Sequence, residues 1–107
     1  MLKEKSINTL SIILNCLEEN KASDIVEIDL NGKMDEADFM IIATGSSKTH
    51  IKAISDKVLL ALKNKKIPSK VEGNDSAEWV LIDSGDVLLN IFKQEVRVFY
   101  DLERLWC

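Results

Sequence analysis

The residues best placed for chemistry are Gly45, Ser46 and Ser47, which separate an apolar run from a helical pattern. A phosphate can rest on the free amides of a helix that begins there. A nucleotidyltransferase would add two carboxylates on the next strand to hold metal ions. Asp83 and Asp86 instead flank a predicted tight turn. The carboxylate pair that such catalysis needs is therefore not convincing, and the Gly-Ser-Ser sequence is interpreted as a turn and a helix cap.

The only histidine, His50, would have to serve any acid–base mechanism that uses an imidazole. No Ser-His-Asp or Cys-His arrangement can be assembled around it, and a lone histidine in the first turn of a helix is more often structural. Cys16 and Cys107 have no Cys or His neighbours at the spacing of metal ligands. The sequence therefore predicts no catalytic residue, no metal and no cofactor.

The segment 78–107 combines aromatic residues with negative charge. It holds both tryptophans, the only tyrosine and two of the three phenylalanines. Residues 1–71 carry eleven cations and ten acids (net +1), whereas residues 72–107 carry three cations and eight acids (net −5). Nucleic-acid affinity comes mainly from cations that neutralise phosphates, so the acidic part suits a basic protein better than RNA or DNA. Solubility alone is an equally good reason for these acids.

The lysines of segment 48–70 define a second candidate surface, which would face RNA. They alternate with the apolar stripe of an amphipathic helix, and this is the ordinary arrangement of a solvated face. Direct RNA binding is therefore the lesser alternative, and no nucleic-acid recognition is expected.

The aromatic residues of segment 78–107 divide into core and contact candidates. Phe92 and Phe99 are expected in the core, because aliphatic residues surround them in the sequence. Trp79, at the start of a predicted strand, and Trp106, near the terminus, are harder to bury in so small a protein. Trp, Tyr and Arg are the residues most often found as interface anchors, so binding and docking of the terminal helix are both open for the tryptophans.

Hydrophobic periodicity predicts the elements that position these residues. Helices are expected over 6–20 and 47–66 and in the final segment, and strands over 25–30, 39–44, 78–83 and 87–92, with a shorter strand at 70–72. Gly85 allows a tight hairpin between the last two long strands. The apolar stripe of the final segment changes register, which predicts a break near Asp101.

This order of elements predicts a single mixed α/β domain over residues 1–107, with helices packed on a small sheet. The N-terminus mixes charges where a secretory signal would be apolar, and no apolar run approaches the ~20 residues of a membrane span. A cytoplasmic protein without membrane association is expected.

Several segments match, in order, a pattern known from one family. They are Asp38 to Ser47 (Asp-Phe-Met-Ile-Ile-Ala-Thr-Gly-Ser-Ser), His50, Ala53-Ile54, Val71-Glu72-Gly73, Glu78 to Asp83 (Glu-Trp-Val-Leu-Ile-Asp), Gly85-Asp86-Val87 and Tyr100 to Trp106 (Tyr-Asp-Leu-Glu-Arg-Leu-Trp). The ordered set spans nearly the whole chain, which in this respect resembles the ribosome silencing factor family, also called the Iojap family.

The resemblance implies a fold related to the nucleotidyltransferases without their catalytic carboxylates, and hence no enzyme. It implies that the protein binds the fourteenth protein of the large ribosomal subunit, on the face that meets the small subunit. Occupying that face would block subunit association and lower translation when nutrients are scarce. Members of the family also tend to form homodimers. Thr49, Ser84 and Asn90 depart from the family pattern, so contacts at these three positions are not carried over.

Docking without a chemical step is therefore the predicted mechanism. Four acids are expected to meet the basic ribosomal protein, namely Asp83, Asp86, Asp101 and Glu103. Five further residues are expected to provide apolar anchoring, namely Trp79, Tyr100, Leu102, Leu105 and Trp106. The alternatives are a small nucleotidyltransferase-like enzyme that uses Ser46 and an RNA-binding module that uses the lysine-rich helix.

Overall fold

The computed structural model describes residues 2–30, 37–102 and 104, and within them the chain forms three helices and five strands. In chain order these are α1 (Leu2–Glu19), β1 (Ser23–Asp29), β2 (Phe39–Thr44), α2 (Lys48–Asn64), β3 (Lys70–Glu72), β4 (Trp79–Asp83), β5 (Val87–Phe92) and α3 (Gln94–Tyr100). The predicted mixed α/β class is confirmed. The pair Asn31-Gly32, whose residue types predict a turn after the first strand, lies outside the described residues. Among the described helices, none is both long and apolar enough to cross a bilayer.

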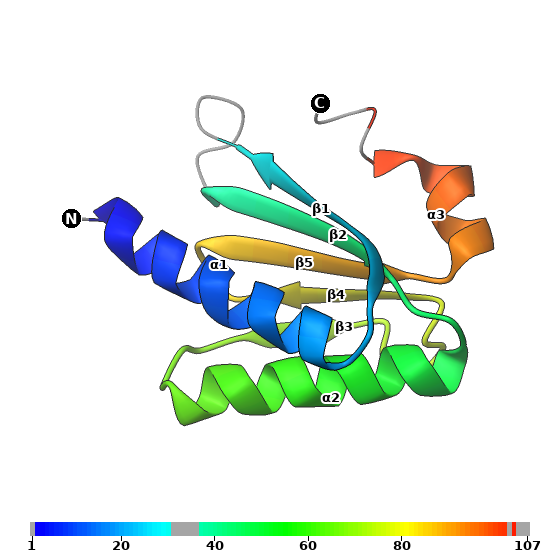
Figure 1. The fold of residues 1–107 in the computed structure, drawn as a ribbon, viewed down its shortest axis with the longest axis horizontal. Helices are drawn as coiled ribbons and strands as arrows, with labels where there is room; N and C mark the ends of the chain where they lie inside the picture. Colours follow the sequence, from blue (N-terminus) through cyan, green and yellow to red (C-terminus); the bar gives the residue numbers. More distant parts are fainter. Residues whose placement is uncertain (1, 31–36, 103, 105–107) are drawn as a thin grey trace.

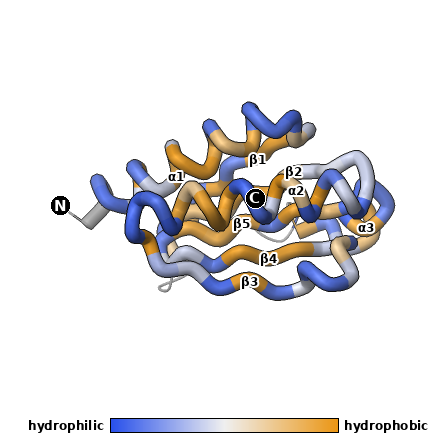
Figure 2. The backbone as a smooth tube through the Cα atoms, turned by 90° about the horizontal axis from the view of Figure 1, so that it is seen from below, coloured by the Kyte–Doolittle hydropathy of each residue, from blue (hydrophilic) through white to orange (hydrophobic). Residues whose placement is uncertain are grey.

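The five strands form one mixed sheet in the order β1-β2-β5-β4-β3 (Figure 1). β2 and β5 run parallel at its centre, and the other neighbouring strands are antiparallel. A strand covered on both faces needs apolar residues at successive positions. All six residues of β2 are buried, as the run Phe39–Thr44 predicted. Figure 2 shows that hydrophobic residues concentrate in these inner strands, whereas the edge strand β3 is mostly hydrophilic.

Helices α1 and α2 lie side by side on one face of the sheet (Figure 1). Their apolar stripes meet the inward side chains of the strands, and Ile13, Leu17, Ile54 and Val58 are all fully buried. A second, smaller cluster, which includes Phe92, lies on the opposite face of the sheet, where Val96 of α3 packs against it. Side chains of a strand alternate between faces, so β5 contributes to both clusters.

Two details of the predicted helices differ from the structure. α1 begins at Leu2, earlier than predicted. The spacing of Ile7 to Leu10 and Leu14 predicts a place in the apolar stripe, but Ile7 is 51% exposed. Ser6 and Thr9 are buried in this part of the helix instead, and the Ser6 hydroxyl donates a hydrogen bond to the carboxylate of Asp38. Asp38 lies just before β2 and gives the Ser6 hydroxyl a partner, so this side of the first turns can face inward. The periodicity of α1 does not reveal that partner.

Candidate docking surface

The candidate site begins where β4 starts and β5 ends. Trp79, the first residue of β4, pairs in register with Phe92, the last residue of β5. The two rings stack, with centroids 4.9 Å apart and planes 28° apart. Such aromatic pairs across neighbouring strands stabilise a sheet beyond simple burial. Phe92 is fully buried, as predicted, whereas Trp79 is half-buried and keeps part of its ring at the surface.

Helix α3 follows β5 directly and ends at Tyr100. Asp101 has left-handed backbone angles (φ 47°), and its amide donates to the carbonyl of Arg97 at 2.9 Å. Asp and Asn tolerate this conformation better than most residues. The predicted break near Asp101 is confirmed, and it stops the helix where Tyr100 lies beside Trp79.

Arg97 attaches α3 to strands β1 and β2. Its guanidinium is buried, and Nη1 donates to the carbonyl oxygen of Asp24 at 2.6 Å and to Oγ1 of Thr44 at 2.7 Å. A buried charge is tolerated only when its donors are well used. The seven-residue helix therefore has a polar attachment to β1 and β2 as well as the apolar contact of Val96 with the second cluster.

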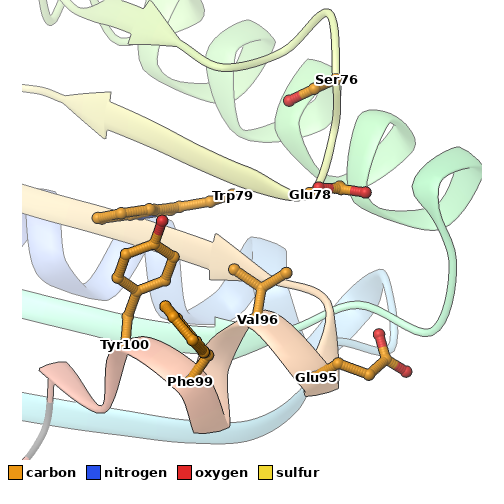
Figure 3. A pocket seen from close by; sticks show the side chains of 7 residues that line it. All are labelled: Ser76, Glu78, Trp79, Glu95, Val96, Phe99 and Tyr100. Carbon is orange, nitrogen blue, oxygen red and sulfur yellow. The ribbon is translucent and has the colours of Figure 1, made fainter.

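An open groove lies between α3 and the start of β4 (Figure 3). It has a volume of about 550 Å³ and is lined by Ser76, Glu78, Trp79, Glu95, Val96, Phe99 and Tyr100. The Tyr100 ring is tilted against Trp79, with centroids 4.7 Å apart, and Phe99 meets Tyr100 edge-on at 5.1 Å. Three aromatic rings thus form a continuous series that runs out from the buried ring of Phe92.

The expectation that Phe99 belongs to the core is wrong, because its side chain is 81% exposed. Val96, Arg97 and Tyr100 share the side of α3 that contacts the rest of the protein, since Tyr100 lies four residues after Val96 and three after Arg97. Val98, 68% exposed, and Phe99 therefore point away from it. By spacing alone, the inward side of α3 could contain Val96 with either Phe99 or Tyr100. Because the buried Arg97 fixes the rotation of the helix, it is Tyr100 that lies on the inward side.

The rim of the groove carries acids that are paired only weakly. Glu78 lies 3.7 Å from the ammonium of Lys48, and Glu95 lies 3.9 Å from that of Lys93. These pairs are largely exposed, and exposed pairs contribute little energy. Both carboxylates can therefore exchange these partners for cations of a docking protein.

The structure brings together only part of the predicted contact set. Trp79, Tyr100, Asp101 and Leu102 lie around α3 and the groove, and Leu102 is half-buried against the second cluster. Glu103, Leu105 and Trp106 lie outside the described residues.

Asp83 and Asp86 lie at the other end of the β4–β5 hairpin, and four residue steps of strand place Asp83 roughly 13 Å from Trp79. One carboxylate oxygen of Asp83 accepts from the amide of Gly85 at 2.9 Å, and Gly85 has the predicted positive φ (88°). The Asp86 carbonyl accepts from the amides of Asp38 and Phe39. The Asp83 carboxylate therefore has a local structural role, whereas Asp86 contributes through its backbone carbonyl, and both residues are remote from the aromatic rings.

Sequence reasoning missed Ser76, Glu78, Glu95 and Val96 as lining residues. The lining comes from the β3–β4 connection, the start of β4 and one side of α3, and only folding makes these neighbours. The acids were counted in the negative charge of segment 72–107, but charge content does not show which of them share a surface.

His50 has a structural role at the start of α2. Ser47 caps this helix by accepting from the His50 amide at 3.0 Å, as the Gly-Ser-Ser sequence predicted. The His50 ring accepts at Nδ1 from the Ser46 amide (2.9 Å), and Nε2 donates to the carbonyl of Asn20 (2.8 Å). The imidazole thus links the start of α2 to the end of α1. Within residues 2–30, 37–102 and 104, no three His, Cys, Asp or Glu side chains are grouped as metal ligands.

Cys16 is the other residue that could have carried chemistry. Burial, followed by the neighbouring charge of Glu19, raises the pKa of the Cys16 thiol above its usual value. A thiol reacts as the thiolate, so this environment makes Cys16 less reactive. Taken together, the fold and the groove define a small α/β protein with an aromatic surface that suits binding.

Comparison with known proteins specifies the class further. The family described as "Ribosomal silencing factor during starvation" matches residues 3–107. A ribosomal silencing factor from Zymomonas mobilis is 40% identical over 98 residues, which are 91% of this chain and 74% of that protein. A crystal structure of a Chromobacterium violaceum protein superimposes with a TM-score of 0.90 at 36% identity, covering 92% of this chain and 83% of the other.

A more distant relative from mouse is named "Mitochondrial assembly of ribosomal large subunit protein 1". It is 29% identical over 101 residues, which are 91% of this chain and 44% of that protein. The family match covers almost the whole sequence, and the chain belongs to the ribosomal silencing factor family. The relation to nucleotidyltransferases stays a prediction.

Proposed function

We propose that this chain acts in the cytoplasm as a translational repressor. It binds the fourteenth protein of the large ribosomal subunit and blocks association with the small subunit by occupying the joining face. Membership of the ribosomal silencing factor family supports this role, as does the family name, which refers to starvation. The observation that carries the proposal is the groove, where Trp79, Phe99 and Tyr100 present their rings at one edge of the molecule.

The exposed rings of the groove suit a partner surface better than solvent. The side chain of Phe99 is 81% exposed and that of Tyr100 is 48% exposed, and the two residues are neighbours at the end of α3. Clustered exposed apolar side chains mark interaction sites, and aromatic anchors supply most of the energy of an interface. Removing these rings from water on binding would therefore drive the association.

The charge around the groove suits a basic partner. Glu78, Glu95 and Asp101 are exposed close to the rings. Complementary charge speeds and orients docking more than it adds affinity. High salt should therefore slow association with the basic ribosomal protein while dissociation changes little. Blocking subunit joining in this way requires only occupancy, without a chemical step.

The remaining residues of the predicted contact set extend this proposal. Glu103, Leu105 and Trp106 follow directly on α3 in the sequence, and we assign them to the same contact. Asp83 and Asp86 lie at the far end of the hairpin, and they join the contact only if the partner covers the length of β4. Trp106→Ala should weaken large-subunit binding by about 1 kcal/mol or more. Unchanged co-sedimentation of a folded Trp106→Ala variant would remove Trp106 from the site.

The experiment that tests the proposal compares two substitutions on different faces. Tyr100→Ala should weaken calorimetric binding to the isolated fourteenth protein about tenfold or more, and it should restore subunit joining measured by light scattering. Leu60→Ala is the control, because Leu60 is equally exposed (51%) but lies on α2. Equal binding by both variants would contradict the proposed surface. Binding that requires ribosomal RNA would favour the RNA-binding alternative.

The free protein is further proposed to form a homodimer. An exposed apolar groove can serve a second copy as well as a ribosomal protein. Sedimentation velocity over a concentration series should therefore show a dimer. A monomer at all concentrations would contradict this part of the proposal without affecting the ribosomal contact.

A further inference from the structure

A buried amide lies beneath the groove and contacts its central ring. Asn90 of β5 is 2% exposed, and its Oδ1 accepts a hydrogen bond from Nε1 of Trp79 at 2.9 Å. Asn90 lies two residues before Phe92, the register partner of Trp79, so both side chains share the face of the sheet on which the indole lies. Asn90 does not line the groove itself. The hydrogen bond to Trp79 therefore connects Asn90 to the lining of the groove.

The same amide is only half satisfied. An indole nitrogen can only donate, so the hydrogen bond from Trp79 fixes which end of the Asn90 amide is the oxygen. The amide nitrogen, Nδ2, is then buried without an acceptor among the described residues. A buried donor without a partner lowers stability. The register neighbours of Asn90 are Leu81 and Ile42, so an aliphatic residue would suit this place in the sheet better.

We infer that Asn90 is a positioning residue, which holds the Trp79 indole in its binding orientation at some cost in fold stability. The inference rests on the proposed function, because it assigns the indole to the contact surface. Three contacts restrain the indole ring: it stacks on Phe92, it packs against the tilted ring of Tyr100, and its nitrogen donates a hydrogen bond to Asn90. A side chain that is already ordered loses less conformational entropy on binding.

Replacing Asn90 by leucine separates positioning from a merely structural role. Asn90→Leu removes the unpaired donor, so the melting temperature should be unchanged or higher. Freeing the indole should at the same time weaken binding to the isolated fourteenth ribosomal protein, by roughly two- to tenfold. If Asn90 served only the fold, stability and affinity would fall together, and that result would overturn the inference.

A double-mutant cycle tests whether Asn90 acts through the indole nitrogen. Trp79→Phe keeps an aromatic ring but removes the donor. In the Trp79→Phe background, Asn90→Leu should have little further effect on affinity, because the hydrogen bond is already absent. Equal weakening by Asn90→Leu in both backgrounds would show that Asn90 acts by another route, and it would overturn the inference.

Hydrogen exchange of the indole N–H in the free protein gives a readout that needs no partner. Trp79→Phe identifies the Trp79 resonance by its loss, and Asn90→Leu should accelerate exchange at that N–H. If Tyr100→Ala weakens binding while Asn90→Leu changes neither exchange nor affinity, the inference alone fails. If Asn90→Leu accelerates exchange but Tyr100→Ala and Trp79→Phe leave binding intact, the proposed docking surface fails, and the inference with it.

Discussion

Replacing Phe99 by alanine gives the sharpest contrast between the structure and the expectation from sequence. A phenylalanine in the core costs about 3–5 kcal/mol of stability when it is truncated to alanine. Phe99 is 81% exposed, so only about a fifth of its surface is removed from water on folding. Complete burial of such a side chain stabilises by roughly 1.5–3 kcal/mol, so the buried fifth contributes roughly 0.3–0.6 kcal/mol.

Two smaller effects nearly offset one another. The edge-on contact with Tyr100 stabilises the parent protein by about 0.5 kcal/mol. The higher helix propensity of alanine stabilises the variant by about the same amount. The unfolding free energy of Phe99→Ala, measured by urea denaturation, should therefore lie within about 1 kcal/mol of that of the parent protein.

Binding should respond far more strongly than stability. If the partner covers the exposed four-fifths of Phe99, its truncation removes roughly 1.2–2.4 kcal/mol of apolar burial. This corresponds to about tenfold to fiftyfold weaker binding, which calorimetry with the isolated ribosomal protein measures directly. Leu60→Ala is again the control, since Leu60 is also exposed (51%) but lies on α2, away from the groove.

Two results would refute this reasoning about Phe99. A loss of more than about 3 kcal/mol in unfolding free energy would show that the ring is buried after all. Affinity within twofold of the parent protein, in a variant with unchanged stability, would show that the partner does not cover this part of α3.

Three further substitutions test the supports of the fold and the site. Gly73→Ala should lose about 2 kcal/mol or more of unfolding free energy in urea, because φ is +83° and the new Cβ would lie 2.2 Å from the carbonyl oxygen of Trp79; a neutral effect would show that the loop adapts. Arg97→Met should lose about 2–4 kcal/mol of unfolding free energy in urea, because the Asp24 carbonyl and the Thr44 hydroxyl lose their donor. Retained stability and retained large-subunit binding would show that α3 does not need this anchor. Alkylation of Cys16 at pH 8 should be much slower in the folded protein than in urea, because burial raises the thiol pKa. The thiol pKa is higher in the folded than in the unfolded protein, so the thiol stabilises the fold below the unfolded pKa, and this contribution is lost as pH rises through the folded pKa. The unfolding free energy of the parent protein should therefore fall more steeply at alkaline pH than that of Cys16→Ala.

Much of the fold follows from local sequence patterns. The continuous apolar run Phe39–Thr44 became the fully buried β2, and the Gly-Ser-Ser sequence became the turn and the cap of α2. The hairpin around Gly85 and the break at Asp101 also lie where the sequence predicted them. Each depends on side-chain periodicity or on the backbone preference of one residue, and these act over a few residues.

The candidate site was only partly predictable, because residue type and charge do not show which residues share a surface. Trp79 and Tyr100 were chosen for their residue types, and the structure places their rings in contact. Asp83 and Asp86 were chosen for their charge alone, and they lie at the opposite end of the hairpin. Composition identifies an acidic segment, but the direction of the strands decides which acids share a surface.

By itself, the sequence determined the class of the fold, the position of most elements and, through its ordered motifs, the family. Tertiary structure decided which side of α3 faces inward, because the anchor of Arg97 on Asp24 and Thr44 joins residues far apart in the chain. The same packing exposed Phe99 and brought Asn90 beneath the Trp79 indole. These choices depend on contacts between distant segments, whose energies no local pattern contains.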